Sequence, residues 1–198
     1  NDVDAALHRN RTNRQSPFAI RPSPIVNRKS TMPLLFDSLF SSVAFSHLIV
    51  DVFNSSRPVL LTYLGLTETQ IALYSTVYIW VSALTQPFFG WMSDRVGPRW
   101  LAAGGVLWMT IFYAGAVFVP GVGGLLCLII AALGSSSFHP VGTVQATLQG
   151  RHRMAGRETT ADSLFFMAGQ LGPFIGPIIT GAILFWFGGH VACPIRPT

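Results

Sequence analysis

Five apolar blocks, each 20 residues or longer, dominate this sequence. They cover residues 34–62, 71–91, 100–119, 122–148 and 160–187. A helix of about 20 mostly apolar residues crosses a bilayer, and in lipid only helices and closed barrels satisfy all their backbone polar groups. Segments of alternating polarity, which are typical of a barrel, are absent. The sequence therefore predicts an all-α membrane protein, a transmembrane bundle of five helices over residues 34–187.

The composition excludes several other classes of protein. Half of the 198 residues are hydrophobic and only 11% are charged, against about 25% in a typical soluble domain, so a soluble enzyme is excluded. The net charge of +5 does not indicate a nucleic-acid partner, because the basic residues lie between apolar blocks. Cys127 and Cys193 are far apart and form no pattern typical of a disulfide framework or a metal site. We expect no metal and no cofactor.

Basic residues indicate how the bundle is oriented. Short connections make neighbouring helices antiparallel, so alternate connections lie on the same side of the membrane. Eleven of the 13 basic residues fall in the N-terminal arm or in the second and fourth connections, and the positive-inside rule then places the N-terminus in the cytoplasm. We expect a basic, disordered cytoplasmic arm over residues 1–33, a tail over 188–198, and a multi-pass protein of the plasma (inner) membrane.

The second connection contains a motif, GWMSDRVGPR, of the form G-x-x-x-D-R-x-G-x-R. It resembles the loop between the second and third helices of the major facilitator superfamily, although Pro98 stands where that family usually has a basic residue. The resemblance implies a gating loop that locks two halves of a transporter together on the cytoplasmic side. Its residues here are Gly90, Asp94, Arg95, Gly97 and Arg99. The alternative is a solvated turn whose charges only set the topology.

The fifth block contains the stretch GQLGPFIGP. Small residues let helices approach closely, and proline removes a helix hydrogen bond, so we expect Gly172, Pro173, Gly176 and Pro177 to shape this helix. The stretch resembles the fifth-helix motif of exporters in the superfamily, with Ala168 and Pro177 in place of glycines. Ordinary packing of a glycine-rich helix is the alternative.

Two further stretches extend the resemblance over about residues 45–187. SHLIVDVFNSSRPVLLTYL in the first block and GSSSFHPVG in the fourth are similar to the fosmidomycin-resistance type within the superfamily. This likeness implies the N-terminal half of a transporter, with five of its six helices present and the C-terminal half missing. It also implies alternating access and a small-molecule substrate of anionic or drug-like character. The arginine-bearing fourth-helix motif of many proton-coupled drug exporters is absent.

Polar residues in the first block fall on one helix face. His47, Asp51, Asn54 and Pro58 are spaced i, i+4, i+7 and i+11, which puts them on one stripe. A charge at the bilayer centre costs at least about 2.5–3.5 kcal/mol, so it indicates function by default. We expect the stripe to face an aqueous cavity and Asp51, paired with His47, to carry proton coupling. A structural clasp between helices is the alternative.

Other blocks carry weaker polar signals. Ser135, His139 and Thr143 share a face of the fourth helix, where His139 is expected to face substrate or simply to pack. Gln170 lies in the middle of the fifth block and is expected to line the cavity or to join two helices. Arg57, near the outer end of the first helix, could attract an anion. A further stripe on the second helix contains Tyr74, Tyr78, Ser82 and Thr85.

Taken together, the residues and the resemblance predict a secondary active transporter that exports small molecules, with the proton as coupling ion. The protein is not expected to be an enzyme. Two alternatives stay open. One is an intramembrane hydrolase, in which a serine of GSSS would be the nucleophile and His139 the base, but it lacks an orienting third group. The other is a membrane binding or sensor protein that does not transport.

Overall fold

The computed structural model describes residues 34–153 and 158–187, and within them every regular element is helical. This confirms the predicted all-α fold class. The arm 1–33, residues 154–157 of the fourth connection and the tail 188–198 lie outside the described residues. The elements are η1 (Leu34–Phe36), α2 (Ser38–Tyr63), α3 (Glu68–Val96), α4 (Pro98–Phe118), α5 (Val122–Arg153) and α6 (Glu158–Phe187).

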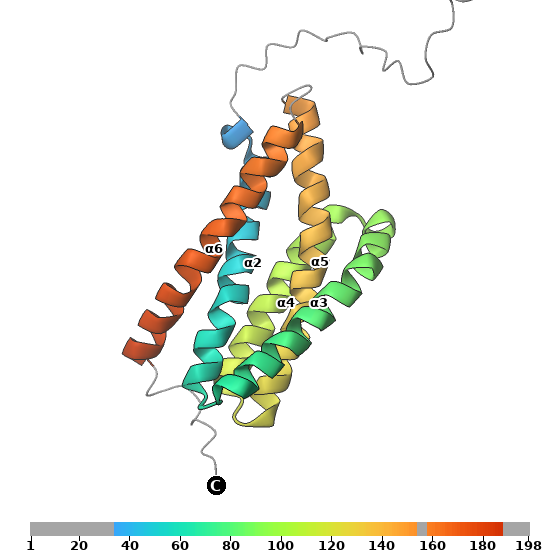
Figure 1. Ribbon diagram of the computed structural model, residues 1–198. Coiled ribbons are helices and arrows are strands. Elements are labelled where there is room, and N and C mark those ends of the chain that lie inside the picture. The colour runs from blue at the N-terminus through green and yellow to red at the C-terminus, as the bar shows by residue number, and fades with distance from the viewer. Residues whose placement is uncertain (1–33, 154–157, 188–198) are drawn as a thin grey trace, which may run out of the picture.

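Short turns make successive helices antiparallel (Figure 1). Between α3 and α4 only Gly97 is non-helical, with φ of 96°, a value that suits glycine, and Pro98 starts α4. Thr67 caps α3 in a reciprocal capping box with Gln70. Consequently the start of α2, the α3–α4 turn, the end of α5 and the start of α6 lie toward one end of the bundle, and the α2–α3 and α4–α5 turns lie toward the other (Figure 1).

Helix α5 lies at the centre of the bundle and packs against α2, α3, α4 and α6. The close packing of α5 against α4 requires glycine, because a Cβ on Gly105 of α4 would lie 2.7 Å from the carbonyl oxygen of Gly134 of α5. The interior between the helices is closed by large apolar side chains. The largest of those that are fully buried are Phe40, Phe138, Phe165, Leu61, Met109 and Leu128.

Helix α6 packs along α2 through a row of buried glycines, Gly169, Gly172 and Gly176. A Cβ on Gly172 would lie 2.6 Å from the Cβ of Asp51, closer than real Cβ atoms approach. The two prolines lie on the outer side, with Pro173 exposed and Pro177 half-buried, and α6 continues as a helix through both. The glycines thus allow the close contact, and the prolines lie away from it.

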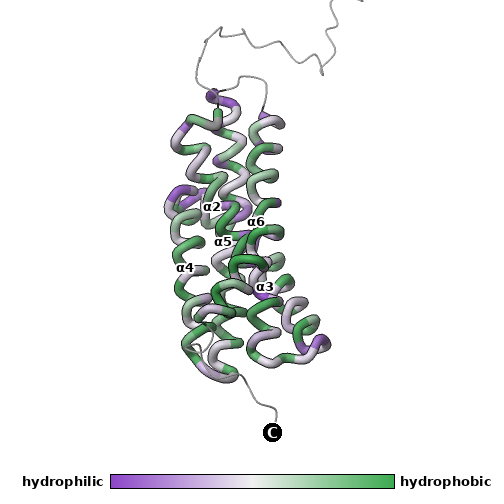
Figure 2. The backbone as a smooth tube through the Cα atoms, turned by 90° about the vertical axis from the view of Figure 1, so that its left-hand side faces the viewer, coloured by the Kyte–Doolittle hydropathy of each residue, from purple (hydrophilic) through white to green (hydrophobic). Residues whose placement is uncertain are grey.

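The outside of the bundle is apolar. Helices α4, α5 and α6 are long and apolar enough to cross a membrane by length and composition. Helices α2 and α3 are 26 and 29 residues long, but their sequences are less apolar and do not meet the same criterion. Figure 2 shows hydrophobic residues along most of the helices. A continuous surface of this kind suits lipid rather than water. Its large side chains include Trp80, Leu84, Trp100, Phe174, Phe185 and Trp186.

Candidate functional site

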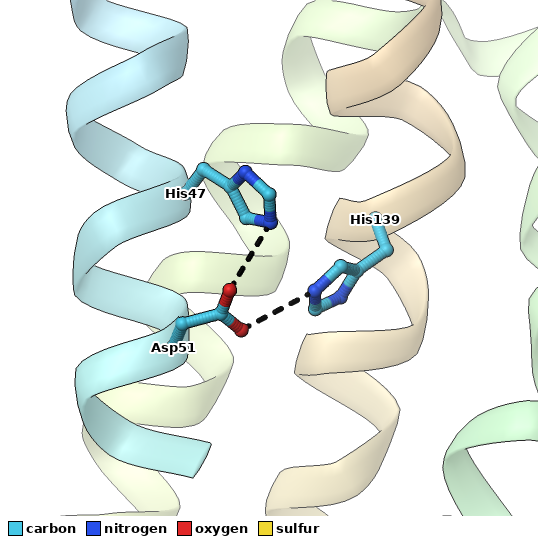
Figure 3. Close-up of side chains that lie close together, drawn as sticks. All are labelled: His47, Asp51 and His139. Atoms are coloured by element: carbon cyan, nitrogen blue, oxygen red, sulfur yellow. Dashed lines mark ion pairs between the residues drawn. The ribbon is translucent and has the colours of Figure 1, made fainter. Parts of the chain in front are cut away.

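The polar stripe of α2 meets α5 at a cluster of three ionisable side chains (Figure 3). His47 Nε2 lies 3.2 Å from Asp51 Oδ2, and His139 Nε2 lies 3.4 Å from Asp51 Oδ1. One carboxylate is therefore shared by two imidazoles, one from its own helix and one from α5. The sequence predicted the first contact from the i, i+4 spacing. The second joins residues 88 positions apart, so no sequence spacing reveals it.

Backbone carbonyls orient both rings. His47 Nδ1 lies 3.0 Å from the carbonyl oxygen of Phe165 on α6, and His139 Nδ1 lies 2.8 Å from that of Ser135. A carbonyl oxygen only accepts hydrogen bonds, so we assign the Nδ1 proton to both histidines on this ground. Each Nε2 is then left to face Asp51. The three side chains thus form one cluster of ionisable groups that is joined to the backbone of α5 and α6.

The number of protons in the cluster determines its charge. An unprotonated Nε2 and a carboxylate oxygen are both acceptors, so each histidine–Asp51 contact needs one proton between its two atoms. Without such protons the cluster carries the −1 charge of Asp51, with one it is neutral, and with two it carries +1. Both short contacts form together only in the doubly protonated state, and loss of one proton must weaken one of them.

The cluster could also be considered as a metal site. The ligand atoms of His47, Asp51 and His139 lie within 4.8 Å of one another, and their types suit a transition metal. Hydrogen bonds account for the same geometry, so we assign no ion here.

The two histidines differ in access. His47 is only 3% exposed; it stacks on Phe165 at 4.1 Å between ring centroids, and a Cβ on Gly169 would touch its ring. His139 is 28% exposed and lines a pocket of about 260 Å³ between α2, α3 and α5. A proton or a ligand in this pocket therefore reaches the cluster from the His139 side.

Hydrogen bonds continue from the cluster along the pocket. Asn54 donates to Asp51 Oδ1 and to Ser135 Oγ, each at 3.1 Å. The Tyr78 hydroxyl of α3 donates to Asn54 Oδ1 at 2.8 Å. The predicted polar stripe of the second helix thus faces the interior at Tyr78. It also faces the interior at Thr85, whose hydroxyl lies 2.7 Å from that of Ser136 on α5.

Arg57 lies at the far end of this chain of contacts. It is 7% exposed, its guanidinium carbon is 4.1 Å from the centroid of the Tyr78 ring, and it lines the pocket. The sequence predicts a position near the outer end of the first helix, whereas the structure buries the side chain beside the pocket. Its spacing of i+3 from Asn54 was the signal that could have added it to the stripe.

Gln170 does not join this group. It is exposed on α6, while its neighbour Gly169 faces His47. Thr143 lies one turn beyond His139, and its hydroxyl donates to the His139 carbonyl at 3.0 Å. The proposed cavity face of α5 therefore consists of Ser135 and His139.

Ser135 and His139 are not arranged as a nucleophile and its base in the assigned tautomer. The Ser135 hydroxyl lies 3.3 Å from His139 Nδ1, but that nitrogen donates to the Ser135 carbonyl and has no lone pair to act as a base. A nucleophilic serine needs a base within hydrogen-bond reach. Ser135 instead accepts from Asn54, which makes it part of the polar network.

The turn between α3 and α4, which carries the GWMSDRVGPR motif, lies at the C-terminal end of α3. Asp94, Arg95 and Arg99 are exposed, and the Arg95 guanidinium carbon lies 3.8 Å from the centroid of the Trp91 ring. A pocket of about 250 Å³ separates this turn from α5 near Pro140. Exposed charges beside a hollow leave this surface available for contact with another polypeptide segment.

An ion pair and a hydrogen bond connect helix ends on the same side of the bundle. Asp37 caps α2 by accepting from the Phe40 amide at 3.0 Å, and its other oxygen lies 2.7 Å from Arg153 of α5. The Thr147 hydroxyl of α5 donates to Asp162 of α6 at 2.7 Å. These contacts hold α2, α5 and α6 in register around the cluster.

Comparisons with known proteins point to one family. The model of the Major Facilitator Superfamily matches residues 39–193. The fosmidomycin resistance protein of Escherichia coli (strain K12) is 28% identical over 163 residues, which are 78% of this chain and 38% of that protein. The uncharacterized MFS-type transporter YfnC of Bacillus subtilis (strain 168) is 28% identical over 147 residues, 72% of this chain and 35% of that protein.

A third relative agrees with these two. The putative multidrug resistance protein MdtD of Yersinia enterocolitica is 24% identical over 153 residues, 70% of this chain and 29% of that protein. The chain thus spans 29–38% of the length of these relatives. No solved structure gave a significant match. The family match covers nearly the whole of the five-helix bundle, and the chain therefore belongs to the major facilitator superfamily of membrane transporters.

Proposed function

We propose that this chain is the N-terminal half of a secondary transporter that exports a small molecule by alternating access, driven by a proton gradient. The observation that carries the proposal is the His47–Asp51–His139 cluster, held inside an apolar bundle beside a polar pocket. Ionisable groups at such depth in a membrane protein are expensive to keep and mark ion or substrate pathways. The printed names of two relatives, a fosmidomycin resistance protein and a putative multidrug resistance protein, support export of drug-like compounds.

The division of the cluster between two helices supports proton coupling. Asp51 and His47 belong to α2, while His139 belongs to α5. Movement of one helix relative to the other would open the Asp51–His139 contact and release the proton it needs. The other ionisable groups near the cluster are Arg57 of α2, Tyr78 of α3 and Tyr113 of α4; α6 contributes the Phe165 ring and carbonyl.

Alternating access requires a second half. In superfamily members two halves rock about a site near the middle of the membrane. In this chain the pocket is walled by α2, α3 and α5, and a C-terminal half would supply the opposite wall. The exposed charges of the α3–α4 turn would then contact that half on the cytoplasmic side and act as the gating loop.

The test separates coupled from uncoupled transport in proteoliposomes that contain the complete transporter. Asp51→Asn preserves the shape of the side chain and removes its charge. It should abolish uphill movement driven by a pH gradient and leave downhill exchange of substrate measurable. Glu68→Gln is the matched control, because this carboxylate is exposed at the start of α3, away from the cluster, and it should transport uphill. Uphill transport by Asp51→Asn would overturn the coupling role and favour a structural clasp.

A further inference from the structure

We propose that Arg57 is the anchor of an anion-binding site in the pocket between α2, α3 and α5, and that the transported molecule carries its negative charge there. The description of this anion as a substrate rests on the proposed function. The inference that an anion binds there depends only on the surroundings of Arg57.

The first observation is that Arg57 is a buried cation without a counter-ion. It is 7% exposed, and in the described part of the chain no carboxylate forms an ion pair with it. The nearest acidic residue along α2 is Asp51, both of whose oxygens face histidines. An uncompensated buried charge costs several kcal/mol, so a ligand that neutralises it gains binding energy.

The second observation is that part of the guanidinium group lacks a hydrogen bond. Arg57 Nε is buried and has no hydrogen-bond partner. Tyr78 covers one face of the group, with the centroid of its ring 4.1 Å from the guanidinium carbon, and it contributes a cation–π contact. The planar fork of arginine matches the paired oxygens of carboxylate, phosphate and sulfonate groups.

The third observation is the lining of the pocket. Polar side chains able to donate hydrogen bonds surround the space that Arg57 borders, and the remainder is apolar. The pocket has a volume of about 260 Å³, enough for an anion of the size of one aromatic ring with its charged group. Its lining consists of Asn54, Arg57, Tyr78, Ile79, Ser82, Ala83, Gln86, Ser135 and His139.

The site would also connect the substrate to the protons. His139 lines the pocket and contacts Asp51, and Asn54 bridges Asp51 to the Tyr78 that covers Arg57. An anion bound at Arg57 therefore lies beside the imidazole whose proton completes the cluster. Release of the anion and release of that proton would therefore both change the contacts that Asp51 makes with His139 and Asn54.

The experiment measures binding by the 198-residue chain in lipid nanodiscs, because every residue of the pocket belongs to this chain. The probes are benzenesulfonate, which stays anionic between pH 5 and 8, and the neutral benzenesulfonamide, which has nearly the same shape. We expect the chain to bind benzenesulfonate at least tenfold more tightly than benzenesulfonamide. Equal binding of the two probes, or no binding of benzenesulfonate, would overturn the proposal.

Three variants locate the site. Arg57→Gln should weaken benzenesulfonate binding about tenfold or more and leave benzenesulfonamide unaffected, while Arg57→Lys should retain part of the affinity because the charge remains. Arg151→Gln is the control, since Arg151 is 67% exposed and faces Glu158, and it should bind as the parent does. Benzenesulfonate affinity that survives Arg57→Gln would contradict the proposal. Removal of a buried unpaired charge should not unfold the chain, and a thermal unfolding curve verifies this.

Flux in the complete transporter separates this proposal from the proposed function. Binding of benzenesulfonate that depends on Arg57, without any coupled flux, would support the anion site and reject the transport mechanism. Proton-driven flux of substrates that remains intact in Arg57→Gln would reject the anion site and support the transport mechanism.

Discussion

The two sides of Asp51 are built differently. On the α6 side His47 is almost fully enclosed, stacked on Phe165 and pressed against Gly169. On the α5 side His139 is more than a quarter exposed and borders the pocket. One carboxylate thus has a closed partner that fixes its position and an open partner that can respond to ligand or proton. Under the proposed coupling mechanism, α2 and α6 would stay together and the movement would occur between α2 and α5.

The open side is expected to lie toward the outside of the membrane. Asn54 and Arg57 follow Asp51 along α2, in the direction of the α2–α3 turn. If the N-terminus is cytoplasmic, that turn is external.

Labelling tests this orientation with an all-or-none result. In a chain whose native cysteines are replaced, Glu68→Cys should react with a membrane-impermeant maleimide added outside intact cells, and Asp94→Cys should not. Both positions are exposed at helix ends, so access rather than burial decides the reaction. Lysed cells, in which both should react, are the control. Labelling at position 94 alone would invert the topology.

The closed side should be the more sensitive to added volume. Gly172→Ala places a Cβ 2.6 Å from that of Asp51, whereas Gly181→Ala on the same helix meets nothing within 4 Å. We expect Gly172→Ala to lower the free energy of unfolding by about 1–3 kcal/mol. Gly181→Ala should leave it unchanged or raise it by up to about 1 kcal/mol. Denaturant unfolding in detergent measures both, and equal effects would show that α6 does not pack on α2 as described.

The two histidines should respond differently to the same substitution. His139→Gln should weaken substrate binding about tenfold and also lower coupling, because its ring borders the pocket and contacts Asp51. His47→Gln should mainly lower stability and coupling, since it loses its contacts with Phe165 and Asp51. Substrate affinity and the uphill-to-downhill flux ratio, measured for both variants, test this. Indistinguishable profiles would contradict the division into a closed and an open side.

Much of the fold could be predicted from the sequence because the physics is local. Each apolar block had to become a helix in lipid, and glycine and proline at the α3–α4 turn matched the observed φ of Gly97 and the start of α4. The i, i+4 pair of His47 and Asp51 needed only helical periodicity. Gln170 shows the limit of such reasoning, because its mid-span position said nothing about which way it faces.

The sequence by itself determined the helical membrane fold, the polar face of α2 and the motif turn, since these depend on composition, periodicity and neighbouring residues. Only the tertiary structure decided that His139 of α5 completes the Asp51 cluster and that Tyr78 of α3 covers a buried Arg57. These contacts depend on how α2, α3 and α5 approach one another, which is set by side-chain packing and by glycines at the helix seams. Spacing along one chain carries no information about the rotation of one helix relative to another.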